Sequence, residues 1–193
     1  MKEFIPHEML SKAQFYKYKF LSIPAVIIVI SFFLRDIHSA AKYLSLLALA
    51  LYFFIFIIFR FKRNFSLPEI NEVLSPINGR IIDIETVENG SIIMIKKPFF
   101  ASAEIVTCTS ADKINTLDMQ QTQISWRISN RFAKIFHESD VNYQAALIGL
   151  SPGSAICALF IPSKYEILVN TKNHLEAGET VVAIEEIKGE NHQ

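Results

Sequence analysis

Two long apolar runs near the N-terminus constrain this chain more than any other feature. Residues 20–34 and 43–59 contain no Asp, Glu, Lys or Arg, and a polar stretch, residues 35–42, separates them. A helix that crosses a bilayer needs about 20 apolar residues. The second run approaches that length, and the first reaches it if Lys19 and Arg35 extend their charges towards water. The sequence therefore predicts a two-helix membrane hairpin, with a buried helix pair in a soluble core or a re-entrant hairpin as alternatives.

Basic residues flank the hairpin on both of its outer sides. Three lysines lie within residues 12–19, and three basic residues lie within residues 60–63. The connection between the two runs carries only Arg35 and Lys42, with Asp36 beside them. Loops rich in Lys and Arg stay on the cytoplasmic side of a membrane. We therefore expect the hairpin to lie in the inner (cell) membrane, with both of its ends and the domain that follows facing the cytoplasm.

The chain beyond the hairpin has the pattern of a mainly β protein. Short apolar or alternating segments are separated by turn residues, as in small all-β barrels and sandwiches. Asn78-Gly79 is the strongest hairpin signal among the turns, because both residues tolerate positive φ. The predicted strands lie within residues 73–85, 91–95, 103–109, 114–117, 124–136, 143–150, 155–161, 165–169 and 181–184. The segment 124–136 keeps no single period, so a strand followed by a short helix is an alternative there.

These patterns divide the chain into two parts. We predict a membrane hairpin with its flanks at residues 1–66 and one small β barrel or sandwich domain at residues 67–193. The 19 basic and 19 acidic residues give a net charge of zero, and this balance argues against nucleic acid as a partner. Cys108 and Cys157 lie in apolar, strand-like runs without metal-ligand spacing or a disulfide framework, so we expect two buried thiols.

Four short segments of the second part carry a resemblance to a known family. They are SPING at 75–79, ISNRFAKI at 128–135, GLSPGSAICALFIP at 149–162 and AGETVVA at 177–183. In this order, and behind a membrane hairpin, they resemble the phosphatidylserine decarboxylase family, particularly its short bacterial and archaeal members. The corresponding family segments are SPADG, AGLVARRI, GxxxxGSRVDVYLP and GETVLA. The matched segments cover most of the chain from the hairpin to residue 184.

The resemblance implies a self-cleaving enzyme. The hydroxyl of Ser154 would attack the carbonyl of Gly153, and β-elimination and hydrolysis would then leave a pyruvoyl group at the new N-terminus. Residues 1–153 would form the β subunit and residues 154–193 the α subunit, and a homo-oligomer of the cleaved subunits is a further expectation. The pyruvoyl group derived from Ser154 would form a Schiff base with phosphatidylserine and act as an electron sink, giving phosphatidylethanolamine. The implied substrate is therefore a phospholipid.

The chain departs from the family pattern at positions that matter for catalysis. Asn78 stands where the family has an aspartate, Val106 is near the position of the family histidine, and Ala155 replaces an arginine. A serine needs an adjacent base to act as a nucleophile. Of the remaining histidines, His137 and His174 lie in the predicted β domain, and His137 is the candidate base. The departures favour a second hypothesis, an inactive relative that binds lipid or a partner protein.

Two further classes of protein share part of the pattern. Residues 176–188 are similar to the hairpin of biotinyl and lipoyl carriers, with Lys188 as the modified lysine. Only five residues follow Lys188, however, whereas a carrier needs a return strand there. A membrane-anchored secretion or efflux adaptor is the other class. It would place its β domain outside the cytoplasm, contrary to the charge pattern.

Overall fold

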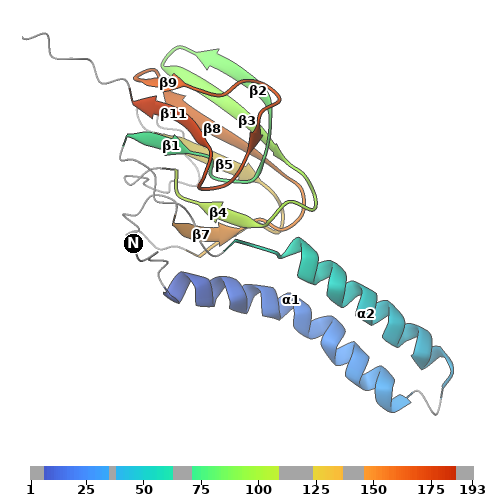
Figure 1. Ribbon diagram of the computed structural model, residues 1–193. Coiled ribbons are helices and arrows are strands. Elements are labelled where there is room, and N and C mark those ends of the chain that lie inside the picture. The colour runs from blue at the N-terminus through green and yellow to red at the C-terminus, as the bar shows by residue number, and fades with distance from the viewer. Residues whose placement is uncertain (1–6, 35–37, 63–70, 109–123, 137–145, 186–193) are drawn as a thin grey trace, which may run out of the picture.

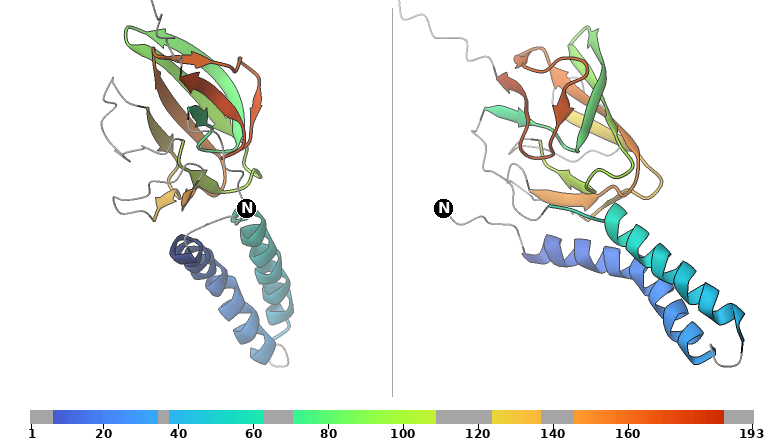
Figure 2. Two further views of the ribbon diagram at one scale, coloured as in Figure 1. Left: turned by 60° about the vertical axis from the view of Figure 1, so that its left-hand side comes forward. Right: turned by 45° about the vertical axis from the view of Figure 1, so that its right-hand side comes forward.

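Two apolar helices precede a mostly β remainder in the computed structural model of the chain (Figure 1). The structure describes residues 7–34, 38–62, 71–108, 124–136 and 146–185, and the statements below concern these ranges. The helices are α1 (His7–Leu34) and α2 (Ala40–Ile58), which pack against each other as an antiparallel hairpin. The hairpin projects from one end of the β part in all three views (Figures 1 and 2).

Both helices are long and apolar enough to cross a membrane. The qualifying spans are Met9–Leu34 and Ala40–Ile58, and only 17% and 11% of their most apolar windows are buried. A pair of core helices in a soluble protein would be covered by other elements. Large apolar side chains such as Phe33 and Leu47 are instead about three-quarters and two-thirds exposed, at 74% and 68%. The alternative of a buried pair in a soluble core is therefore not supported.

The β part consists of short strands paired in an antiparallel manner. The strands are β1 (Glu72–Leu74), β2 (Gly79–Val87), β3 (Gly90–Lys97), β4 (Glu104–Val106), β5 (Ser125–Ser129), β6 (Lys134–Ile135), β7 (Leu147–Leu150), β8 (Ala155–Pro162), β9 (Tyr165–Ile167), β10 (His174–Leu175) and β11 (Val181–Glu185). A five-stranded sheet has the order β10-β2-β3-β8-β5, and two three-stranded sheets have the orders β1-β11-β9 and β4-β7-β6. The largest sheet curls like half of a barrel around the main core (Figure 1).

The base of the hairpin is packed onto the β part. Pro24 lies inside α1, where its ring removes a helical hydrogen bond and favours a bend. α1 contacts both α2 and β7, and its N-terminal part lies beside β7 (Figure 1). Ala13 and Phe59 are buried in one apolar cluster with Leu147 and Leu150. The first turns of α1 therefore belong to the core of the β part as much as to the hairpin.

The Asn78-Gly79 hairpin prediction is wrong. β1 pairs with β11 and β2 pairs with β3, so the two strands that flank this turn do not pair with each other. The β2–β3 hairpin instead turns at Glu88 and Asn89. Gly79 is needed for close approach, since a Cβ atom there would lie 2.8 Å from the backbone oxygen of Lys96. Asn78 does lie between two strands, β1 and β2, but these strands do not pair, and neither Asn78 nor Gly79 has a positive φ.

The other strand predictions differ mainly in length. The described residues of the segment 103–109, which are 103–108, contain only the short strand β4. The segment 124–136 contains two strands, β5 and β6, with no helix. β10 was not predicted. The weak strand at 114–117 lies outside the described residues. Cys108 and Cys157 are buried, as expected, and form no disulfide with a described residue. Burial raises the pKa of the Cys157 thiol.

Candidate functional site

The turn between β7 and β8 contains the predicted cleavage point. Ser151, Pro152 and Gly153 are buried, whereas Ser154 is exposed. Gly153 has a φ of 74°, in the left-handed region that only glycine adopts without strain. The side-chain amide of Asn130 donates to Ser151 Oγ at 2.7 Å and to the Pro152 oxygen at 2.8 Å. These contacts hold the turn in one conformation and present Ser154 at the surface.

A buried lysine contacts the carbonyl that the predicted reaction would attack. Lys97 is the last residue of β3 and stands opposite Ala155, the first residue of β8. Its side chain is fully buried. The Lys97 Nζ atom donates to the Gly153 oxygen at 2.7 Å and to the Ala101 oxygen at 3.0 Å. Burial lowers the pKa of Lys97 to about 8, and the nearby Glu104 carboxylate partly offsets that shift.

This arrangement has a defined chemical capacity. A charged donor at 2.7 Å polarises the Gly153 carbonyl and is placed to stabilise the oxyanion that forms when a nucleophile adds to it. The nearest hydroxyl along the chain is that of Ser154. That hydroxyl has no hydrogen-bond partner among the described residues. Activation of the carbonyl is therefore present in the structure, whereas a base for Ser154 is not seen in the described ranges.

Neither His174 nor Val106, near the position expected for the family histidine, supplies a base for Ser154 in the structure. His137 lies outside the described residues. His174 is exposed in β10 and aligns through Arg80 and Lys96 with Ile156 in β8. Three strand spacings separate β10 from β8, which is roughly 14 Å. Val106, near the position of the family histidine, is fully buried in an apolar cluster.

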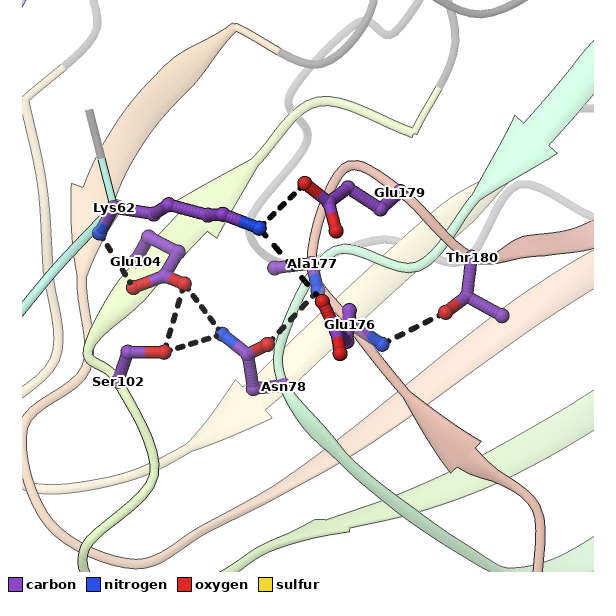
Figure 3. A network of polar contacts seen from close by, with 8 residues as sticks. All are labelled: Lys62, Asn78, Ser102, Glu104, Glu176, Ala177, Glu179 and Thr180. Carbon is purple, nitrogen blue, oxygen red and sulfur yellow. Dashed lines mark hydrogen bonds and ion pairs between the residues drawn. The ribbon is translucent and has the colours of Figure 1, made fainter. Parts of the chain in front are cut away.

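A polar network joins the hairpin exit to three loops of the β part (Figure 3). The carboxylate of Glu104, only 1% exposed, accepts hydrogen bonds from Asn78 Nδ2 at 2.6 Å and Ser102 Oγ at 2.8 Å. It also accepts one from the backbone N–H of Lys62 at 3.3 Å. Asn78 Oδ1 accepts from the backbone N–H of Ala177 at 3.1 Å. Asn78 thus bridges Glu104 and the turn after β10.

The network explains why residue 78 is an asparagine. An amide can donate to the Glu104 carboxylate and accept from Ala177 at the same time. An ionised aspartate in this position would place a second carboxylate against Glu104 with no proton to share. The amide of Asn78 therefore suits a site in which its neighbour is the buried Glu104 carboxylate.

A pocket of about 480 Å³ opens beside this network. Its walls include Arg60, Lys62, Ala101 and Glu104. The Ala101 oxygen is also one of the two acceptors of Lys97 Nζ. Lys97 Nζ therefore links Ala101, a residue of the pocket wall, to the Gly153 carbonyl.

Sequence reasoning did not identify Lys97, although a signal was present. Ile93 and Ile95 of β3 face the core of the β part, and Lys97 is the next residue on the same face of the strand. Lys96, at the intervening position, is exposed. A lysine in register with core isoleucines at the end of a strand indicates a buried ammonium, and buried lysines need polar partners.

Comparisons of the chain with protein-family models, with curated proteins and with solved structures find no match.

The buried Lys97 predicts how stability depends on pH. Its pKa of about 8 lies below the value of 10.5 for an unfolded lysine, so between these values the unfolded chain binds more protons. Stability then rises with pH across this window, by on the order of 3 kcal/mol for this group. We expect wild-type protein to gain stability relative to Lys97→Met between pH 8 and 10, measured by denaturant unfolding in detergent micelles. If the free energy of unfolding changed with pH in the same way for both proteins, Lys97 would not be a buried lysine with a lowered pKa.

Proposed function

We propose that this chain is a membrane-anchored, self-processing decarboxylase of phosphatidylserine that works through a pyruvoyl group and yields phosphatidylethanolamine. The proposal includes a small β barrel of the decarboxylase type on the cytoplasmic side of the inner membrane. One observation carries it: the ammonium of the buried Lys97 donates to the carbonyl of Gly153, directly before the exposed Ser154. That carbonyl is the one that self-processing must activate.

The chemistry of the processing step assigns a role to each group. Ser154 Oγ adds to the Gly153 carbonyl carbon, its proton passes to a base, and Lys97 stabilises the resulting oxyanion. Collapse breaks the Gly153–Ser154 peptide bond and leaves an ester and a free amine on residue 154. Loss of the Cα proton of residue 154 then expels the Gly153 carboxylate. Hydrolysis of the resulting dehydroalanine releases ammonia and leaves the pyruvoyl group. We assign the base to His137.

The exposure of Ser154 fits a pyruvoyl group at this position. A carbonyl on residue 154 would be open to an incoming amine, since the Ser154 side chain is at the surface. When present, the group supplies an electron sink for the loss of carbon dioxide from the substrate. The protein's part is to hold the turn, through Asn130 and Lys97, and to keep the site beside the membrane.

The position of the turn supports a lipid substrate. A Cβ atom built on Gly153 would lie 3.4 Å from the ring of Phe99. Phe99 in turn stacks on Phe54 of α2, with ring centroids 5.8 Å apart. One aromatic ring therefore connects the Gly153 turn to the helical hairpin. A phospholipid that stays in its bilayer would meet Ser154 without leaving the interface.

The second candidate function is that of an inactive relative that binds lipid or a partner protein. The buried, apolar setting of Val106 favours it, because no titratable group replaces the family histidine there. His174, roughly 14 Å away across the sheet, does not supply a base either. In this alternative the hydrogen bond between Lys97 and Gly153 only stabilises the conformation of the turn.

The intact mass of the full chain, purified from membranes in mild detergent, distinguishes the two candidates. We expect two fragments, residues 1–153 and 154–193, with the smaller one lacking a free amino group. Release of carbon dioxide from phosphatidylserine labelled in its carboxylate should accompany the cleaved form. A single uncleaved chain would exclude the pyruvoyl mechanism and leave the inactive relative.

A further inference from the structure

The loop between β3 and β4 carries two adjacent aromatic side chains at the surface. Phe99 is 42% exposed and Phe100 is 59% exposed, and their ring centroids are 5.1 Å apart. Large exposed apolar groups that lie together mark a surface that meets another apolar phase or a partner. Their neighbours on the chain decide between these possibilities.

The height of this loop along the hairpin follows from two aromatic contacts. Lys17 Nζ lies over the ring of Phe56, 3.8 Å from its centroid, and so marks the level of a charged group on the hairpin. Phe54 is two residues farther from the β part along α2, a rise of about 3 Å. Phe99 stacks on Phe54. The ring of Phe99 therefore reaches past the Lys17 ammonium to the apolar part of the hairpin.

The surface around the two rings continues the apolar surface of the hairpin. Phe53, Phe54 and Ile57 at this end of α2 are themselves 56%, 41% and 45% exposed. The Arg60 guanidinium donates to the Phe100 oxygen at 3.4 Å, so a cation stands directly beside the aromatic pair. Aromatic rings next to basic groups are typical of the boundary between hydrocarbon and lipid head groups.

We propose that the Phe99–Phe100 loop inserts into the lipid bilayer beside the hairpin and forms a second membrane contact of the β part. The occupant of this surface is lipid, because the loop is continuous with helices that are apolar over the length of a membrane span. The inference rests on the proposed membrane location of the hairpin and is independent of the proposed chemistry.

Insertion has a consequence for the Gly153 turn. The inserted segment contains Ala101, whose oxygen accepts from Lys97 Nζ, and Phe99, which packs on Gly153. The same lysine donates to the Gly153 oxygen. The depth at which the loop lies in the bilayer therefore fixes the depth of the Gly153–Ser154 bond.

Tryptophan fluorescence in vesicles tests the insertion. The chain has one tryptophan, Trp126, so Trp126→Phe gives a silent background for Phe100→Trp in the full-length protein. The protein is reconstituted in phosphatidylcholine vesicles whose acyl chains carry bromine near the head group or near the methyl end. We expect a blue-shifted emission for Phe100→Trp and strong quenching by the shallow bromines. Quenching should be at least three-fold stronger than for the control Leu168→Trp.

The two reference positions separate the possible results. Leu168 is 47% exposed and follows β9, at the end of the β part away from the hairpin (Figure 1). Phe33, 74% exposed near the far end of α1, reports whether the hairpin itself is in lipid. Quenching of Phe33→Trp without quenching of Phe100→Trp overturns the inference and leaves the hairpin in the membrane. A blue-shifted but unquenched Phe100→Trp also overturns it, because a second copy or a partner protein then covers the loop. Absence of quenching at both positions overturns the inference and the membrane location together.

Discussion

Ser154→Ala is expected to leave a single uncleaved chain under conditions in which the wild-type protein is fully processed. The variant lacks the hydroxyl whose attack on the Gly153 carbonyl begins the proposed reaction, so the ester cannot form and the later elimination cannot follow. Ser154 is exposed and makes no hydrogen bond to another described residue, so the substitution should not alter the fold. Intact mass and near-ultraviolet circular dichroism would check both parts of this prediction.

Two variants control the Ser154 experiment. Ser154→Cys keeps a nucleophile and should retain cleavage at the same bond. Ser163→Ala removes another exposed serine, just after β8, and should be processed like the wild-type protein. Cleavage of Ser154→Ala between residues 153 and 154 would mean that a protease cuts the chain at this turn. The proposed self-processing would then be wrong, even if two fragments are found in the wild type.

Lys97→Met is expected to slow processing on the order of 10²–10³-fold, which is the usual effect of losing one oxyanion donor. Methionine is similar to lysine in length and apolar, so it can occupy the same buried site without leaving an unpaired charge. The Gly153 carbonyl would lose the donor at 2.7 Å that polarises it. The measurement is the rate at which the full-length precursor disappears after synthesis in the presence of membranes.

A neighbouring residue on the same strand provides the matched control. Lys96→Met removes an exposed charge one position away and should leave the rate unchanged. The pKa of about 8 adds a second signature, because wild-type processing that needs the Lys97 ammonium should decline above that pH. A wild-type rate in Lys97→Met would show that the lysine holds the turn and does not stabilise the oxyanion. The proposed role of Lys97 in processing would then be wrong.

Some features of the candidate site were predictable from local sequence. Gly153 has the positive φ that a glycine in a turn suggests, and Ser154 is exposed beside it. The Lys97–Gly153 contact was not predicted, because it joins residues 56 positions apart. It exists because β3 pairs with β8 and sets Lys97 opposite Ala155. His137, the base taken from sequence, lies outside the described residues, and its role stays a prediction.

The sequence by itself determined the parts whose signals are local. Two uncharged runs are enough to specify two apolar helices, and short alternating segments between turn residues are enough to specify strands. The tertiary structure alone decided which strands pair and which polar groups meet. Asn78-Gly79 joins strands that do not pair with each other, and Asn78 instead bonds with Glu104. The physical reason is that the spacing of apolar residues over a short segment determines whether it forms a helix or a strand. Strand pairing depends instead on packing between segments that are distant in the chain.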